Sequence, residues 1–381
     1  MKAEQFIWTA QNEWKPSLST ASAGGSAQVA FLFGRAKLIS ESGAMDAVKL
    51  AYPKAHVFGC STAGEIQNVN VMDETLVLTA LSLEHSRIAT GQTKIEGPDK
   101  SFDAGVRLAG QFNGKGLRHV FVLSEGLCVN ASDLVAGMNS VLPAGVIASG
   151  GCAGDGNRLQ TTHVWCDGEP QQSAAVALGF YGEALRVGVA AIGGWKPFGP
   201  DRLITRSKQN VLYEIDNKPA LALYKQYLGE YAKGLPATGL QFPLELCTGK
   251  NQERVVRAIL GVNEADQSIT FAGNVPEGAY ARFLVGHTED LIEGTQVAAR
   301  GTIAELNTFA PQFSILVSCN GRRFVLKQRI EEEVEMVREA LGSGAVMTGF
   351  YSYGEIAPAQ GGGKAELHNE TMTITTFAEA A

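Results

Sequence analysis

The residues with most chemical potential lie in three glycine-rich turns that repeat along the chain, at 59–66, 149–155 and 349–356. Each turn follows an apolar run and ends in Gly plus a carboxylate, which is Glu65, Asp155 or Glu355. These carboxylates either accept hydrogen bonds from turn N–H groups or face a ligand in a crevice, since crevices form at strand ends. Their repeated position favours the structural role. The middle copy has Ser149 where the other copies have Gly.

The glycine-rich turns could also cradle phosphate through exposed backbone N–H groups. None of them reads G-x-x-x-x-G-K-[ST], and none shows G-x-G-x-x-G opening a helix. A β-rich segment follows each turn, so no helix dipole is available there. The sequence therefore predicts that these glycines serve backbone geometry at crowded strand ends, and the lining of a ligand crevice is compatible with that.

Two thiols flank these turns, and they allow an enzymatic alternative. Cys60 and Cys152 could act as nucleophiles if a base stood beside them. No His or Lys lies at a recognisable catalytic spacing, and small buried Cys are common at apolar strand ends. A thiol-dependent enzyme is thus the weakest of the functions considered, and we expect no enzymatic activity.

The six His residues show no H-x-x-x-H, H-E-x-x-H or Cys/His metal spacing, so a structural zinc is not predicted. His368 stands beside Asn369 at the entrance to the last strand, opposite the third turn. His287 precedes a helix start. If one His is a metal ligand, His368 is the first candidate and His287 the second.

The elements that must position these groups alternate between strands and helices. Apolar runs at 28–34, 119–123 and 313–319 each lead to a helical segment, a second strand and a glycine-rich turn. The segments at 161–166 and 173–180 are expected to pair as a hairpin across the turn Asp167-Gly168, and Asn130 or Ser132 is expected to cap the helix at 131–142. The helix at about 321–341 has Val334, Val337 and Leu341 as its inner face, and a solvated face is predicted for a charged set, Glu331, Glu332, Glu333, Glu335 and Arg338.

This self-similarity predicts a mixed α/β (α+β) fold built from repeated strand–helix–strand–hairpin units. We expect two separate mixed β-sheets flanked by helices. A length of 381 residues favours two domains, and the turn-rich segment near 214–218 places them at 1–214 and 215–381.

Composition narrows the class of protein. The chain has 32 basic and 39 acidic residues, a net charge of −7, with basic residues scattered, so neither nucleic-acid nor anionic-membrane binding is predicted. No apolar run approaches the roughly 18 residues of a membrane-spanning helix. The six Cys are far apart and the N-terminus shows no signal peptide. We expect a cytoplasmic protein with reduced thiols.

Four motifs, taken in order, resemble the FIST family, which pairs a FIST N domain with a FIST C domain. They are Gly-Cys-Ser-Thr-Ala-Gly-Glu-Ile at 59–66, Gly-Gly-Cys-Ala-Gly-Asp-Gly at 150–156, Lys-Gln-Asn-Val-Leu-Tyr-Glu-Ile-Asp-Asn-Lys-Pro-Ala at 208–220, and Gly-Phe-Tyr-Ser-Tyr-Gly-Glu-Ile-Ala-Pro with Leu-His-Asn-Glu-Thr at 349–371. The resemblance runs from about residue 28 to 377. It implies a sensor of small ligands in signal transduction, and no enzyme.

In length and layout the chain also resembles the haem-binding, nitric-oxide-sensing (NosP) subgroup of that family. This resemblance implies haem b as cofactor, nitric oxide as signal and a partner histidine kinase. The alternative is a sensor of an amino acid or other small metabolite without haem. The family's usual His-Asn-Gln-Thr reads His-Asn-Glu-Thr at 368–371 in this chain.

The residues permit a haem site in the C-terminal part of the chain. His368 would bind the iron, with Asn369 and Glu355 near the ligand. Phe350, Tyr351, Tyr353 and Met347 could line the cavity, and Arg323 or Arg322 could pair with a propionate.

Overall fold

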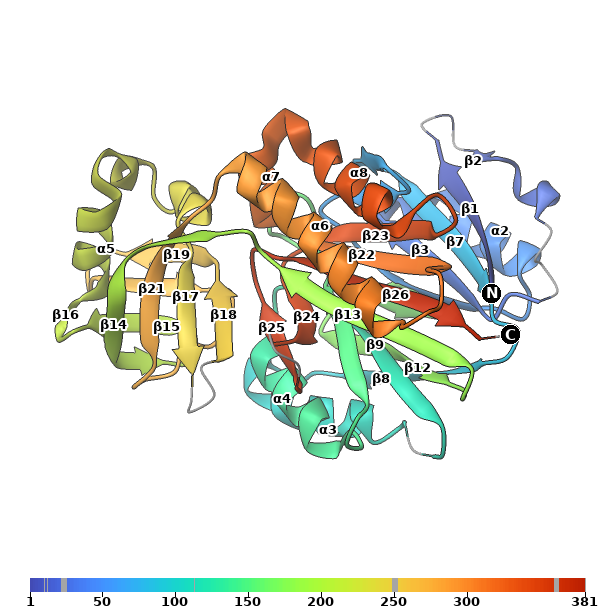
Figure 1. Ribbon diagram of the computed structural model, residues 1–381, viewed down its shortest axis with the longest axis horizontal. Coiled ribbons are helices and arrows are strands. Elements are labelled where there is room, and N and C mark those ends of the chain that lie inside the picture. Colours follow the sequence, from blue (N-terminus) through green and yellow to red (C-terminus); the bar gives the residue numbers. More distant parts are fainter. Residues whose placement is uncertain are drawn as a thin grey trace.

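The computed structural model of the protein describes residues 1–9, 11, 13–21, 26–112, 114–248, 253–359 and 363–380. This part of the chain forms a body of three six-stranded sheets with helices outside them, and a smaller domain built on an eight-stranded sheet (Figure 1). We call the smaller domain, residues 196–285, the inserted domain; it lies at the left of Figure 1. The predicted mixed fold is confirmed. Within the described residues, no helix is both long enough and apolar enough to span a membrane.

Each sheet of the body is built on one repeat, and we number the repeats as units 1 to 3. The elements of unit 1 are β1 (Lys2–Trp8), β2 (Trp14–Lys15), η1 (Leu18–Thr20), β3 (Val29–Gly34), α1 (Ala36–Ser42), α2 (Ala44–Ala51), β4 (His56–Cys60), β5 (Glu65–Gln67), β6 (Asn70–Met72) and β7 (Leu76–Ser82). Those of unit 2 are β8 (Arg87–Lys94), η2 (Pro98–Lys100), α3 (Ser101–Ala109), β9 (Leu117–Ser124), α4 (Ala131–Val141), β10 (Ile147–Cys152), β11 (Val164–Cys166) and β12 (Ala174–Tyr181).

Unit 3 contains the inserted domain between its first strand and its first helix. Its own elements are β13 (Leu185–Ile192), α6 (Thr288–Glu305), β22 (Phe313–Cys319), α7 (Asn320–Leu326), η5 (Lys327–Arg329), α8 (Ile330–Leu341), β23 (Val346–Ser352), β24 (Glu355–Pro358), β25 (Ala365–His368) and β26 (Met372–Glu379). The inserted domain consists of β14 (Lys196–Lys208), β15 (Val211–Ile215), β16 (Lys218–Pro219), α5 (Ala220–Leu228), η3 (Gly229–Gly234), η4 (Ala237–Gln241), β17 (Leu244–Thr248), β18 (Glu253–Arg257), β19 (Ile259–Asn263), β20 (Ser268–Phe271) and β21 (Tyr280–Val285).

The local sequence explains why these elements begin and end where they do. All six residues of β3 are buried, as a continuous apolar run predicts for a strand covered on both faces. Gly43, with a φ of 68°, separates α1 from α2 in a left-handed conformation that suits glycine. The predicted cap of α4 is confirmed, because the Asn130 side chain accepts a hydrogen bond from Asp133 N.

The three units exchange strands in a closed cycle. In each unit a parallel pair, β3–β4, β9–β10 or β22–β23, forms the centre of the sheet. The chain then turns and contributes its next strand to another unit's sheet: β5 pairs with β23, β24 with β10, and β11 with β4. The body therefore has one sheet per unit, and the expectation of two sheets was wrong because these pairings are non-local.

The same exchange corrects one predicted hairpin. The segments at 161–166 and 173–180 were expected to pair across the turn Asp167-Gly168. Instead β11 joins β4 of unit 1, while β12 lies between β9 and β8. The turn residues are therefore placed between two different sheets.

Three glycines occupy the same position in the three parallel pairs. A Cβ on Gly59, Gly150 or Gly349 would lie 1.8, 1.8 or 1.9 Å from the carbonyl oxygen of the paired residue in the neighbouring strand. No side chain fits at that distance, so backbone approach explains these glycines. Gly150, and not Ser149, is thus the counterpart in unit 2, and the sequence comparison of the turns was wrong by one residue.

The inner faces of the three sheets meet in one aromatic core. Phe31 of unit 1 packs against Phe121 of unit 2 and Phe313 of unit 3, with ring centroids 6.3 and 5.7 Å apart. Phe350 belongs to the same core, and its ring centroid lies 4.9 Å from that of Phe33. Each fully buried Phe contributes about 1.5–3 kcal/mol from burial, so this core holds the three units in one body.

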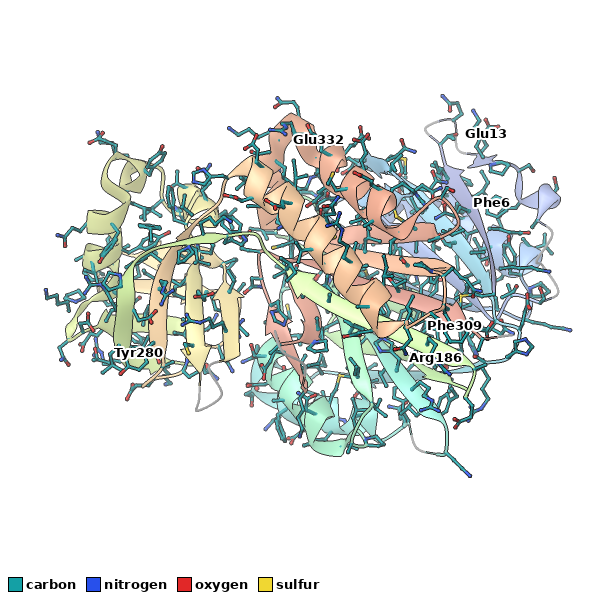
Figure 2. All side chains as sticks on the ribbon, viewed as in Figure 1. Phe6, Glu13, Arg186, Tyr280, Phe309 and Glu332 are labelled. Carbon is teal, nitrogen blue, oxygen red and sulfur yellow. The ribbon has the colours of Figure 1, made fainter. Side chains whose placement is uncertain are left out.

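Helix α8 covers the outer face of the unit 3 sheet. Val334, Val337 and Leu341 are buried, as their helical spacing predicts. Glu332 lies on the outside of the helix (Figure 2). Glu333 was predicted to be solvated, but it is fully buried and accepts hydrogen bonds from Arg322, Ser318 and Tyr351. Helical spacing could not predict this burial, because it depends on the tertiary pair that Glu333 forms with Arg322.

The inserted domain leaves the body after β13 and returns before α6. Its sheet runs β18-β17-β21-β14-β15-β20-β19, with β16 on β15. The division of the chain into 1–214 and 215–381 stays a prediction. Its boundary falls within β15, which pairs with β14 on one side and β20 on the other.

Candidate functional site

The carboxylates of the three turns hold the crossing points between the sheets. Glu65 accepts hydrogen bonds from the side chains of Thr62 and Thr75 and from Thr75 N, 3.1 Å away. Glu355 has the same arrangement with Ser352 and Thr371, and its distance to Thr371 N is 3.2 Å. Both carboxyl groups hold their turns through the hydroxyl of Thr62 or Ser352, while the N–H donor lies beyond the turn, at Thr75 or Thr371.

Asp155 performs a similar task with different partners. Its oxygens accept from the backbone N–H groups of Leu159, Gln160 and Thr161 at 2.9 to 3.0 Å. The Tyr353 hydroxyl also donates to it, so a unit 3 side chain is tied to the unit 2 turn. The three turns are joined directly as well, by bonds such as Ala63 N to Tyr351 O at 2.8 Å.

Burial determines the protonation of the two glutamates. It raises the pKa of Glu65 to about 7 and that of Glu355 to about 8, against the lowering effect of their hydroxyl and N–H partners. Cys60 and Cys152 are buried beside these turns, and burial raises the pKa of both thiols. Such thiols are poor nucleophiles, because the thiolate is the reactive form.

An apolar cavity of about 330 Å³ lies between the body and the inserted domain, at the strand ends of units 2 and 3. We call it the interdomain cavity. The body contributes Gly126, Leu127, Asn157, Leu159, Cys319, Asn320, Gly321, Phe324, Ser352 and Tyr353. The inserted domain contributes Pro236, Ala237, Leu240, Ala258, Ile259, Leu260 and Ala272. A volume above about 300 Å³ suits a small organic ligand.

The polar groups in the cavity wall mostly bind one another. Asn320 Nδ2 donates to Asn157 Oδ1 at 3.2 Å and to Gly156 O at 3.3 Å. The Tyr353 hydroxyl, which shares its one proton between Asp155 and Gly156, lies 2.9 Å from Gly156 O. None of the described lining residues is Lys, Arg, His, Asp or Glu. The wall can therefore offer apolar contact and a few neutral hydrogen bonds, but no charge partner.

Only one of the predicted aromatic residues reaches this cavity. Tyr353 lines it. Phe350 faces the aromatic core instead, and Tyr351 faces α8 and donates a hydrogen bond to Glu333. Met347 is also fully buried in the layer under α8. Successive strand residues point to opposite faces, so Phe350 and Tyr351 could not share one cavity.

His368 lies in β25 behind the cavity, and it does not line it. Its Nε2 is 3.1 Å from Ala357 O, and the side chain is buried. Burial, followed by the nearby Arg257, lowers the pKa of His368 to about 4, so the ring is neutral at pH 7. His287, the second candidate, precedes α6 and does not line the cavity either.

The two residues after His368 carry polar atoms without partners. Asn369 Oδ1 accepts from Ala258 N at 3.5 Å, while its Nδ2 and both Glu370 carboxyl oxygens have no hydrogen-bond partner among the described residues. A Cβ at Gly321 would lie 2.1 Å from Glu370 Oε1, so this carboxyl group packs against the cavity wall. Burial raises the pKa of Glu370 well above its usual value. This shift favours the neutral, protonated carboxyl group.

The two arginines proposed for propionates have other partners. Arg322 is fully buried; it pairs with Glu333 at 2.9 Å and donates to Gly193 O at 2.6 Å and Leu291 O at 3.0 Å. Gly193 lies in the connection into the inserted domain, and Leu291 lies in the first turn of α6, just after the chain returns from it, so Arg322 ties the two ends of the insertion together. Arg323 pairs with Asp73 at 2.8 Å and donates to Ala63 O.

The residues of the interdomain cavity do not fit haem b. Haem needs an axial ligand, and its two propionates need basic partners. Cys319 and Tyr353 are the only described lining residues of an axial-ligand type, and burial raises the pKa of both groups, which disfavours the thiolate and phenolate that bind iron. No described lining residue is basic, and His368, Arg322 and Arg323 are engaged elsewhere.

Most of the cavity wall was missed by the sequence reasoning. Candidate residues were sought at the ends of β4, β10 and β23. No role was given to the residues at or just after the ends of β9 and β22, which are Gly126–Leu127 and Cys319–Gly321. These lie at the same edge of the sheets, where crevices form. That signal was available in the sequence. The contribution of η4 and β19 was not, because it depends on how the inserted domain docks.

The chain matches two known family models, and its fold has distant similarity to solved structures. The family model of the FIST N domain matches residues 28–218, and that of the FIST C domain matches residues 220–358. A search of curated proteins found no match. The cyanuric acid hydrolase from A. caulinodans is similar with a TM-score of 0.38 and 8% identity, covering 100% of this chain and 99% of the hydrolase. PurLQS from Thermotoga maritima has a TM-score of 0.17 and 8% identity, covering 94% and 67%. At these scores neither structure carries an argument about function.

Proposed function

This chain belongs to the FIST family, whose domains are small-ligand sensor domains in signalling, and on that premise we propose that its ligand binds in the interdomain cavity. The observation that carries the proposal is the position of this cavity. Its wall is shared between the body and the inserted domain, so a bound ligand would contact both.

Ligand binding there would change the population of domain arrangements. A ligand shifts a conformational equilibrium only by its different affinity for the two states. Contacts from Ile259 and Leu240 of the inserted domain exist only when that domain is docked, whereas those from Tyr353 and Phe324 belong to the body. A ligand that fills the cavity therefore favours the docked arrangement.

Polar contacts near the cavity also depend on docking. Arg257 is buried and donates to Leu367 O of the body at 2.7 Å. Asn274 Nδ2 donates to Asp133 Oδ1 at 2.8 Å. These bonds fix the docked position, and the ligand adds apolar contacts to them.

The chemistry of the wall favours a neutral, largely apolar ligand. A zwitterionic amino acid or a carboxylate would lose its hydration without gaining a charge partner, which is costly. The interdomain cavity therefore supports the small-metabolite version of the sensor, with an uncharged metabolite in preference to an amino acid.

The haem-binding, nitric-oxide-responsive version stays a prediction from the resemblance, as do the histidine kinase partner and the cytoplasmic location. An absorption spectrum tests it directly. Protein mixed with haemin shows a strong Soret band that shifts with nitric oxide if the haem version holds, and His368→Ala weakens that band if His368 binds the iron. We expect no such band, since the described cavity wall holds no His and no basic partner for the propionates.

A thermal-shift screen tests the cavity. Neutral metabolites with one to three rings, and separately the free amino acids, are added to the full chain, and a stabiliser raises the unfolding midpoint by mass action. Ala272→Phe, which fills the cavity, should abolish the stabilisation. Ala265→Phe makes the same change in an exposed turn of the inserted domain and should leave it intact. Full stabilisation of Ala272→Phe would exclude the interdomain cavity as the site.

A further inference from the structure

A second hollow of about 410 Å³ lies at the strand ends of units 1 and 2 and shares no lining residue with the interdomain cavity. We call it the basic cleft. Its charged and polar lining includes Arg35 and Lys37 after β3, Ser61 and Thr62 after β4, and Arg158, Thr161 and His163 from the loop after β10. The residues of that loop alternate: Asn157 and Leu159 line the interdomain cavity, whereas Arg158 and Gln160 line the basic cleft.

The basic cleft has an excess of positive charge. Arg35 and Arg158 both donate to the same carboxylate, Glu74, so one negative charge serves two guanidinium groups. In the described residues each of these guanidinium groups makes no other hydrogen bond, and a guanidinium has five N–H donors. Lys37 is 3.8 Å from Glu41 and 64% exposed, which makes a weak pair.

The carboxylate that lines the basic cleft does not cancel this charge. Both oxygens of Asp155 accept hydrogen bonds from the backbone N–H groups of its own loop, and the Tyr353 hydroxyl also donates to Oδ1. Against the effect of burial, these bonds lower the pKa of Asp155, so it keeps its negative charge. Among the lining residues, three cations therefore stand against one carboxylate.

Neutral hydrogen-bonding groups complete the wall. Ser61 Oγ accepts from His163 N at 2.9 Å, which leaves its own O–H to donate elsewhere. His163 Nδ1 is buried and has no hydrogen-bond partner in the described part of the chain. An unsatisfied buried nitrogen is costly, and because His163 lines the cleft, a group that binds there can satisfy it.

We propose that the basic cleft is a second binding site, which takes a small oxyanion, a carboxylate or a phosphate group of a metabolite. Arg158 and Lys37 supply charge, and Ser61 Oγ and His163 supply neutral hydrogen bonds. A guanidinium matches the geometry of both carboxylate and phosphate oxygens. The site is separate from the interdomain cavity and does not depend on the function proposed for it.

Isothermal titration of the full chain with inorganic phosphate and with succinate, at pH 7 and low salt, tests this site. Sodium chloride at matched ionic strength is the control for screening. We expect saturable binding of one anion per chain for phosphate, succinate or both. Phosphate alone would identify a phosphate-bearing ligand, and succinate alone a carboxylate.

Variants connect that binding to the cleft. Arg158→Gln and Lys37→Gln should each weaken it about tenfold, the value of one charge-assisted contact. Arg118→Gln removes a similarly exposed arginine that pairs with Glu183 far from the cleft, and it should change nothing. Lys37 is exposed, so its variant tests the site even if Arg158→Gln unfolds. Binding no tighter than that of chloride, or equal affinity in wild type and Lys37→Gln, would overturn the proposal.

Discussion

The strand ends of unit 1 and unit 3 share a backbone and differ in chemistry. Glu65 and Glu355 hold their turns through the same kinds of bonds, from a Ser or Thr three residues before and from a Thr that follows. The residues at the end of the first strand of each parallel pair, β3 in unit 1 and β22 in unit 3, differ. Arg35 and Lys37 in unit 1 correspond to Cys319 and Gly321 in unit 3. The first pair lines an open basic cleft, and the second lines an apolar cavity under the inserted domain.

This difference shows that the repeated motif determines the backbone conformation, whereas the residues next to the motif determine which ligand can bind. The glycine and the carboxylate recur because strands cross between sheets there. The side chains just outside the motif, and the domain inserted in unit 3, decide which molecules fit.

The largest expected difference in stability is between loss of the buried Arg322–Glu333 pair in unit 3 and loss of the half-exposed Arg35–Glu74 pair in unit 1. Arg322→Met leaves Glu333 as an unpaired buried carboxylate and removes the bonds to Gly193 O and Leu291 O, so the free energy of unfolding should fall by about 3–5 kcal/mol. Arg35→Met removes a half-exposed pair with Glu74 and should cost less than about 1 kcal/mol. Urea denaturation measures both, and similar losses would contradict this distinction.

The next effect should be equal in the two units. Gly59→Ala and Gly349→Ala each place a methyl group within 2 Å of a carbonyl oxygen, and each should lower the free energy of unfolding by about 3 kcal/mol. Gly344→Ala, at a position with open space around it, is the control and should change stability by less than about 0.5 kcal/mol. Chemical denaturation provides the values. Tolerance of Ala in one unit alone would show that the backbones are not equivalent.

A smaller effect appears in the dependence of stability on pH. The pKa of Glu65 is raised to about 7 and that of Glu355 to about 8, so the folded chain keeps protons that the unfolded chain releases above pH 4.5. The stability that each group contributes is present below pH 4.5 and is lost as pH rises through its folded pKa, by at most about 1.4 kcal/mol per pH unit.

The two glutamine variants separate the contributions of Glu65 and Glu355 to this pH dependence. Glu355→Gln should flatten the loss of stability between pH 7 and 8, whereas Glu65→Gln should flatten it only below pH 7. Glu370, whose pKa is also raised, continues to contribute in both variants. Unfolding free energies at pH 5, 6, 7 and 8 provide the comparison, and identical curves for the two variants would refute the assignment.

Much of the fold could be predicted from local patterns. The strand at 313–319 was predicted with the bounds that the structure shows, and the Asn130 cap followed from its place before α4. The strand exchange could not be predicted, because β5, β11 and β24 are short and pair with distant units. Glu333 shows the same limit, since its partner Arg322 lies on another helix.

The candidate site was predicted only at its edge. Tyr353 lines the cavity, and the sequence placed it at a strand end. Phe350 and Tyr351 were grouped with it, although adjacent strand residues point to opposite faces. His368 was chosen for its type and its neighbour Asn369. Its hydrogen bond to Ala357 O depends on the pairing of β24 with β25, which no short motif contains.

The most direct test of the central claim measures both sites in both variants. The neutral stabiliser found in the screen and the oxyanion that binds the cleft are each titrated into Ala272→Phe and Arg158→Gln. Our account predicts that Ala272→Phe loses the neutral ligand and keeps the anion, while Arg158→Gln weakens the anion about tenfold and keeps the neutral ligand. A variant that weakens both ligands equally would contradict two chemically distinct sites on one repeated backbone.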